Sequence, residues 1–149
     1  MIKFIREHQI DAAPEAVWTV LGDFMNIDRF APEITSVDTL TTGENGIGSQ
    51  RRCHFANGTS LIEEVISWTP DEAFEVKLSD MAAMPLREAR SEVRVIPVKG
   101  GSKVVWGFDY RVKYGPIGWL LGQTLMKMMM GKVIDGNLKG LEAEVLGGA

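Results

Sequence analysis

Alternating apolar and polar residues predict strands over most of this chain. Residues 2–10 place Ile2, Phe4 and Ile10 on one face, which is the period of a strand with one buried side. Similar signals, bounded by turn residues, recur in six further segments: 33–41, 48–55, 59–68, 73–78, 86–96 and 103–113. The middle of the chain therefore predicts a run of neighbouring strands.

Two pairs of these segments are predicted hairpins. Residues 48–55 and 59–68 are joined by Ala56-Asn57-Gly58, and the Asn-Gly pair favours a tight turn with positive φ. The last two strands are joined across Gly100-Gly101, which permits a sharp reversal. Hairpins of this kind make the predicted sheet antiparallel.

Helical signals flank the strands on both sides. Asp11 and Pro14 mark the start of a short helix that ends near Gly22, and a second short helix or turn follows around 26–30. After residue 116, apolar residues recur at steps of three and four: Leu120, Thr124, Met130, Ile134, Leu138, Leu141 and Val145. We therefore predict a single α+β domain over residues 1–149, with a long C-terminal helix covering one face of a sheet of six to seven strands.

Composition narrows the function classes. A net charge of −4 argues against a nucleic-acid partner, which would need a basic face. The chain has one cysteine, Cys53, and two histidines, so no internal disulfide can form and we expect no metal site and no cofactor. Residues 1–8 mix charges with apolar residues, unlike a signal peptide, and no uncharged run approaches the roughly 18–20 residues of a membrane span. We expect a cytoplasmic protein.

Several motifs give the chain a resemblance to a known superfamily. They are Ile10-Asp-Ala-Ala-Pro-Glu-Ala-Val-Trp18, Asp23, Phe30-Ala-Pro32, Gly46-Ile-Gly-Ser-Gln-Arg51, Glu64, Gly100-Gly-Ser-Lys-Val-Val-Trp106 and Leu138-Lys-Gly-Leu141. In these the chain resembles the helix-grip (SRPBCC) superfamily of START lipid-transfer domains, birch-pollen allergen proteins and bacterial polyketide cyclases/dehydrases. The resemblance implies a curved sheet gripping the C-terminal helix around a cavity. The motifs are scaffold residues, so they indicate the fold and leave the function open.

Strand and helix parity predict which side chains face that cavity. The candidates for ligand binding are mostly apolar, with a few polar groups, as is usual for a small-molecule pocket. They are His8, Arg51, Phe55, Glu64, Phe74, Val76, Ser91, Trp106, Phe108, Tyr110, Met130 and Ile134.

The polar candidates each allow a structural and a functional interpretation. Arg51 and Glu64 fall opposite each other if the hairpin turns at Asn57-Gly58. Such an ion pair could orient a ligand, or it could be purely structural, each charge serving only as the counterion of the other. His8 could transfer protons near neutral pH or be hydrogen-bonded in the core. Tyr110 could donate a hydrogen bond to a ligand, whereas Cys53 is most simply a small apolar residue.

The beginning of the C-terminal helix is unusually apolar. Met126, Met128, Met129 and Met130 follow the apolar residues of segment 117–121, and three consecutive methionines cannot share one helix face. This segment could be the entrance to the cavity, a homodimer contact or a surface that touches a membrane, or it could be buried under the preceding loop.

Taken together, these patterns favour a protein that binds or carries a small hydrophobic ligand, such as a lipid, an isoprenoid or a polycyclic compound. The alternative is an enzyme similar to the polyketide cyclases/dehydrases. The sequence contains no phosphate-binding loop, nucleophile elbow or His-x-x-x-His zinc motif to support another chemistry.

Overall fold

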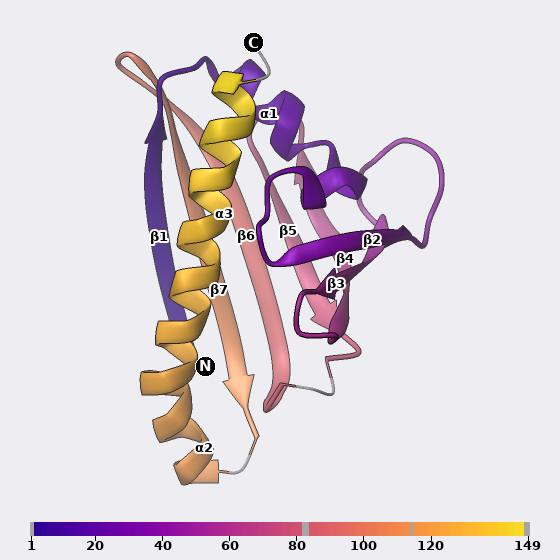
Figure 1. The fold of residues 1–149 in the computed structure, drawn as a ribbon, viewed down its shortest axis with the longest axis vertical. Helices are drawn as coiled ribbons and strands as arrows, with labels where there is room; N and C mark the ends of the chain where they lie inside the picture. Colours follow the sequence, from indigo (N-terminus) through magenta and orange to yellow (C-terminus); the bar gives the residue numbers. More distant parts are fainter. Residues whose placement is uncertain (1, 82–83, 114, 148–149) are drawn as a thin grey trace.

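A seven-stranded antiparallel sheet forms the body of the molecule, and its strand order is β1-β7-β6-β5-β4-β3-β2 (Figure 1). The structure is a computed structural model that describes residues 2–81, 84–113 and 115–147. The strands are β1 (Ile2–Ile10), β2 (Ile34–Thr39), β3 (Gln50–Phe55), β4 (Ser60–Thr69), β5 (Ala73–Ser79), β6 (Leu86–Val98) and β7 (Gly101–Val112). The prediction of an antiparallel sheet of six to seven strands is confirmed.

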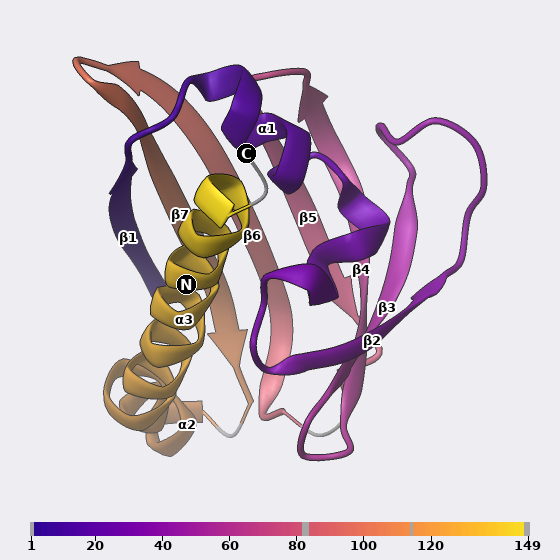
Figure 2. The same cartoon turned by 45° about the horizontal axis from the view of Figure 1, so that its top comes forward.

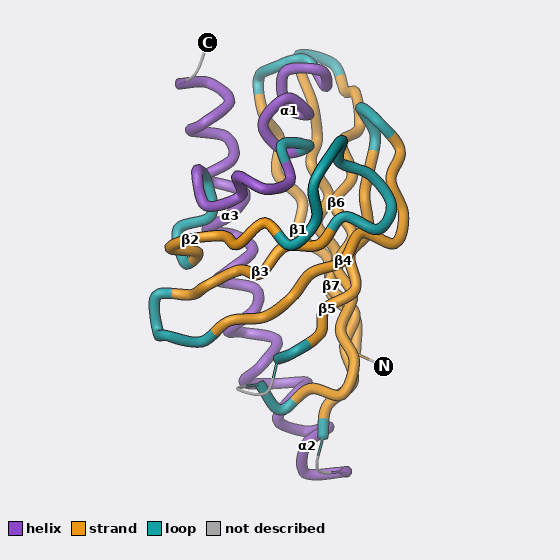
Figure 3. Tube along the Cα trace, turned by 90° about the vertical axis from the view of Figure 1, so that its right-hand side faces the viewer, coloured by secondary structure: helices purple, strands orange, loops and turns teal. Residues whose placement is uncertain are grey.

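All helices lie on one face of this sheet, as Figures 1 and 2 show. The helix α1 (Pro14–Leu21) and the short helix η1 (Phe24–Arg29) follow β1. After β7 the chain runs through α2 (Gly115–Leu121), one π-helical turn at 122–126 and α3 (Lys127–Gly147) without a break. In the side view of Figure 3, β2 and β3 bend round toward α3, so the sheet is curved and half encloses the helix. This is the helix-grip arrangement.

The hairpin between β3 and β4 turns through Ala56-Asn57-Gly58, whereas the expected Arg51–Glu64 pairing required a two-residue turn at Asn57-Gly58. The Phe55 N–H donates to the Thr59 carbonyl over 2.8 Å, which leaves a three-residue loop. Gly58 closes that loop at a φ of 87°, a conformation that glycine adopts without strain. A two-residue Asn-Gly turn would have shifted the pairing by one position.

This register decides which glutamate faces inward. Arg51 pairs with Glu63 and not with Glu64, so the expected Arg51–Glu64 pair is wrong. Glu64 lies on the opposite face of the sheet, where Gln50 donates a hydrogen bond to it over 3.1 Å. Side chains alternate between the two faces along a strand. In the first half of β4, the one-residue difference therefore turns the residues expected to face inward to the outer face, and those expected to face outward to the inner face.

A β-bulge reverses the alternation in the second half of β4. The pairing with β5 shifts by one residue between Val65 and Ser67. Val65 is fully buried before the bulge, and beyond it Trp68 returns to the same inner face and stacks on Phe74 with ring centroids 5.5 Å apart. The bulge thus allows a single strand to contribute both Val65 and Trp68 to the core.

The C-terminal helix is tightly packed over only part of its length. Its buried positions in α3 run from Gly131 to Val145, with Met126 also buried, whereas Leu120 and Thr124, which were expected to belong to the stripe, are exposed. The reason is geometric: α2 lies beyond the end of β7, where no sheet remains to cover it (Figure 1). Farther along, a Cβ atom on Gly140 would collide with the carbonyl of Phe30, so glycine is needed where the helix meets the end of η1.

Candidate functional site

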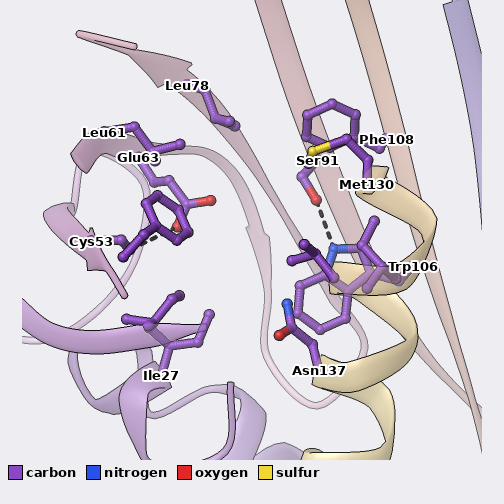
Figure 4. A pocket seen from close by; sticks show the side chains of 14 residues that line it. Ile27, Cys53, Leu61, Glu63, Leu78, Ser91, Trp106, Phe108, Met130 and Asn137 are labelled. Atoms are coloured by element: carbon purple, nitrogen blue, oxygen red, sulfur yellow. Dashed lines mark hydrogen bonds between the residues drawn. The ribbon is translucent and has the colours of Figure 1, made fainter. Parts of the chain in front are cut away.

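A cavity of about 70 Å³ lies between α3 and the inner face of the sheet (Figure 4). Strands from β2 to β7, η1 and α3 contribute to its wall, which is mainly apolar. The lining residues are Ile27, Ile34, Cys53, Phe55, Leu61, Glu63, Leu78, Ser91, Trp106, Phe108, Met130, Val133, Ile134 and Asn137. A hollow enclosed by apolar walls with a few polar groups is the usual form of a small-molecule site.

A second, larger hollow of about 350 Å³ adjoins this inner cavity. The two share Phe55, Leu61, Met130 and Val133 in their walls, so the inner cavity and the larger one lie on either side of the same side chains. The larger hollow, which we call the mouth, is lined by Glu33, Phe55, Asn57, Thr59, Leu61, Met84, Pro85, Met126, Met129, Met130 and Val133. Flexible methionine side chains on one rim suit an opening that adapts to different apolar shapes.

The structure brings half of the predicted site residues together and separates the rest. Six line the inner cavity: Phe55, Ser91, Trp106, Phe108, Met130 and Ile134. Phe74 and Val76 are buried on the inner face of β5 but do not line the cavity. Tyr110 is fully buried between Phe4 and Phe108, and burial raises the pKa of its hydroxyl.

The charged candidates lie outside the cavity. His8 has the expected inward parity but meets α3 nearer its C-terminal end, where its Nε2 lies 3.0 Å from Glu142 Oε1. Arg51 is buried behind the cavity wall, and Glu64 is on the other face of the sheet. The carboxylate that lines the cavity is therefore Glu63, which sequence reasoning assigned to the outer face.

A buried ion pair forms the wall behind Glu63. Arg51 donates through Nε and Nη2 to Glu63 Oε1, over 2.8 and 2.7 Å, and through Nη1 to the carbonyl of Phe24. The guanidinium also lies over the Phe24 ring, 3.8 Å from its centroid. Since the Arg51 side chain is only 3% exposed, the pair holds its charges away from water. Arg51 thus supports the wall without facing the cavity.

The thiol of Cys53 extends this network. Its Sγ donates to Glu63 Oε1 over 3.3 Å. Burial raises the pKa of the Cys53 thiol far above its ordinary value, and the negative charge of Glu63 raises it further. The thiol is therefore protonated at neutral pH and acts as a hydrogen-bond donor, which excludes the thiolate that nucleophilic catalysis needs.

Two further polar groups face the cavity. The Trp106 indole donates from Nε1 to Ser91 Oγ over 2.9 Å, and the Ser91 hydroxyl donates to the carbonyl of Gly107 over 3.2 Å (Figure 4). Asn137 differs from both, because it is 6% exposed and its Oδ1 has no hydrogen-bond partner among the described residues. Asn137 was missed by the sequence analysis, although it stands three residues after Ile134 and so on the same helix face.

The start of the helix carries a separate feature, an exposed apolar surface beside the mouth. Its large side chains are 48–74% exposed: Ile117, Trp119, Leu120, Leu121, Leu125, Met128 and Met129. In the part of the chain that the structure describes, no helix is long and apolar enough to cross a membrane. The described residues also contain no cluster of histidine, cysteine or acidic side chains placed to hold a metal ion.

Comparison with known proteins gives one family and several structures of the same fold. A family model described as polyketide cyclase/dehydrase and lipid transport matches residues 1–146. The protein TTHA0849 from Thermus thermophilus superimposes with a TM-score of 0.80 at 22% identity, over 99% of both chains. XoxI from Bacillus cereus gives 0.79 at 19%, over 98% of this chain and 96% of the other. Ara h 8.0201 gives 0.71 at 16%, over 98% of both. No curated protein matches the chain.

Proposed function

Because this chain belongs to the polyketide cyclase/dehydrase and lipid transport family, we propose that it binds a small hydrophobic molecule between α3 and the sheet and carries it. The observation that supports this most directly is that the inner cavity and the apolar mouth adjoin each other at Phe55, Leu61, Met130 and Val133. Burial of apolar ligand surface against such walls supplies the main driving force for binding.

Titration with a neutral apolar fluorophore, N-phenyl-naphthylamine, tests this proposal. Wild-type protein should enhance the dye emission with a saturable curve. Met130→Trp should weaken dye binding at least about tenfold, because Met130 is shared by both hollows and a larger ring there would fill them. Met128→Trp is the matched control, since Met128 is exposed and lines neither hollow. Absence of saturable binding by the folded wild-type protein would refute the carrier function.

A second candidate function is catalysis of the cyclase/dehydrase type, and the observation that favours it is Glu63. The Arg51 and Cys53 bonds all go to Glu63 Oε1, and Figure 4 shows the other carboxylate oxygen turned toward the cavity. That oxygen could accept a proton from an acidic CH₂ group of a bound polyketone. If wild-type protein binds a poly-β-ketone analogue and never converts it, this second function is excluded and the carrier remains.

We further propose that the exposed apolar surface at residues 117–129 docks on an anionic lipid membrane. The chain has a net charge of −4, yet between Asp109 and Asp135 it has no acidic residue and includes Lys113, Lys127 and Lys132. Apolar side chains accompanied by lysines suit the interface of a negatively charged bilayer. The surface adjoins the mouth through Met129, so docking would place the cavity opening near the lipid.

Vesicle co-sedimentation distinguishes this docking from self-association. The wild type should bind phosphatidylglycerol-containing vesicles, bind neutral phosphatidylcholine vesicles more weakly and lose binding in high salt. The double change Trp119→Glu and Met128→Glu should abolish binding without unfolding the protein, because both side chains are more than half exposed. A concentration-dependent dimer that this variant disrupts, with no vesicle binding by the wild type, would overturn membrane docking and assign the surface to a second copy of the chain.

A further inference from the structure

The polar groups around the inner cavity differ in whether their hydrogen bonds are already made within the protein. The described hydrogen bonds commit the donors near Glu63 to protein partners: Cys53 and Arg51 donate to that carboxylate, and Arg51 also to a backbone carbonyl. Trp106 donates to Ser91, and the single proton of Ser91 goes to the backbone carbonyl of Gly107. Cys53, Trp106 and Ser91 therefore have no S–H, N–H or O–H left for a ligand, and Arg51 does not line the cavity.

Asn137 and Glu63 are the exceptions. Asn137 lies in the cavity wall, its Oδ1 is fully buried and unpartnered among the described residues, and no described hydrogen bond uses the two N–H groups of its Nδ2. Glu63 contributes a second carboxylate oxygen on the opposite wall, and Figure 4 shows both residues directed toward the space between β3, β4 and α3. An unsatisfied buried acceptor destabilises the empty protein, because it has lost its hydrogen bonds to water. A ligand group that can both donate a proton and accept one can hydrogen-bond to the Glu63 oxygen and to the Asn137 amide together.

We infer that the inner cavity receives the hydroxyl end of an uncharged apolar molecule, an alcohol or a phenol, whose proton is donated to Glu63 and whose oxygen accepts a hydrogen bond from the Asn137 amide, while its apolar body fills the mouth. The inference rests on the proposed binding function and specifies its ligand class. The sizes agree with this orientation, because the inner cavity of about 70 Å³ suits a small end group and the mouth of about 350 Å³ suits the larger apolar part.

The same arrangement disfavours carboxylate ligands such as free fatty acids. A carboxylate has no proton to donate, and it would lie beside the negative charge of Glu63 in a poorly hydrated site. The positive charge of Arg51 reduces this repulsion, but Arg51 lies behind the wall with its Nε, Nη1 and Nη2 groups directed at protein partners, so it does not bind the carboxylate directly. Selectivity for a neutral hydroxyl over an anion of the same chain length is therefore expected.

Displacement of N-phenyl-naphthylamine by three ligands with the same decyl chain tests the inference. The ligands are decanol, decyl methyl ether, which keeps the oxygen but lacks its proton, and decanoate. Decanol should bind at least about tenfold more tightly than the ether, the ratio expected for one good hydrogen bond to a buried acceptor. Decanoate at neutral pH should bind no better than the ether.

Two variants locate the effect. Asn137→Leu should weaken the binding of decanol and of the ether together, because both oxygens can accept from the amide, whereas Ile134→Leu, an apolar exchange one turn away in the same wall, should preserve both affinities. If Asn137→Leu fails to fold, the side-chain amide resonance of Asn137 in the wild type provides the test. It should shift on addition of either decanol or the ether.

The outcomes separate the inference from the function on which it rests. Equal affinity for decanol, its ether and decanoate, with dye binding intact, would overturn the hydroxyl subsite and leave the carrier function standing. Tighter binding of decanoate would also overturn it. If the folded protein neither binds the dye nor any decyl ligand, the carrier function and the subsite both fail.

Discussion

The two ends of the C-terminal helix have opposite environments within one continuous element. Near its C-terminal end, Leu141 is fully buried and Gly140 sits against the backbone of Phe30. Arg29 adds a 2.7 Å ion pair with Glu144. Near its beginning, Leu120 is 60% exposed and the helix lies beyond the sheet. We call these regions the packed end and the open end.

The difference indicates a division of tasks along the helix. Close packing fixes the packed end on the sheet and closes the cavity on that side, because even one added methyl group would collide there. The open end has apolar side chains that no part of the described structure covers, and its methionines form the rim of the mouth. Stability should therefore depend on the packed end and on the network behind the cavity, and binding should depend on the open end.

The largest expected effect comes from the ion pair that supports the cavity wall. Glu63→Gln should lower the free energy of unfolding by about 3–5 kcal/mol, because it leaves the buried charge of Arg51 without its counterion. Glu64→Gln, one residue away on the outer face, is the control and should change stability by less than about 0.5 kcal/mol. Urea denaturation measures both. Equal effects would mean that the inward register of β4 is incorrect.

A pair of leucines compares the two ends directly. Leu141→Ala should cost about 2–4 kcal/mol in unfolding free energy, since the side chain is fully buried and its loss leaves a cavity. Leu125→Ala removes a side chain that is half exposed at the open end, and it should cost less than about 0.5 kcal/mol. A large loss of stability for Leu125→Ala in denaturant titrations would contradict the division between packed and open ends.

Alanine substitutions of two glycines in α3 should differ somewhat less in their effect on stability. Gly140→Ala should destabilise the protein by about 1–3 kcal/mol, because the new methyl group forces α3 away from Phe30. Gly147→Ala, where a Cβ meets open space, should be neutral or slightly stabilising. Thermal unfolding of both variants checks this. A neutral Gly140→Ala would show that the packed end can move without cost.

The smallest expected effect is a pH dependence from Cys53. The raised pKa keeps the folded thiol protonated, whereas the unfolded thiol ionises near its ordinary value of 9.0. Above pH 9 the thiol ionises only in the unfolded chain, which favours unfolding. The contribution of Cys53 to the free energy of unfolding is therefore fully present below pH 9 and falls above it, by at most about 1.4 kcal/mol per pH unit. Cys53→Ala should show a shallower decline of stability between about pH 8 and 10. Identical slopes for the two proteins would refute the buried, protonated thiol.

Most of the fold could be predicted from the sequence because local patterns determine it. The alternation in β7 correctly placed Trp106 and Phe108 on the inner face, and the change of period after residue 115 marked the start of the helix. These signals are strong because each segment has one buried side, so an error of one position would expose a whole row of apolar residues.

The site was harder to predict because it depends on contacts between segments. Glu64 was expected in place of Glu63, since sequence alone did not distinguish a two-residue from a three-residue loop at Asn57-Gly58. His8 has the right parity for the cavity, but the path of α3 brings it to Glu142. Leu120 fits the helical stripe, yet periodicity does not reveal where the sheet beneath a helix ends.

The three-residue loop between β3 and β4 also has a consequence for how this scaffold can diverge. If the loop lost one residue and the hairpin still used three loop residues, β4 would shift by one position against β3, and Glu64 would face inward in place of Glu63 with its apolar neighbours exchanged as well. The bulge before Ser67 offers a position where a compensating insertion could restore the inward orientation of Trp68. Length changes in a solvent-facing loop, and not only substitutions in the cavity wall, could therefore alter ligand preference among descendants of this chain.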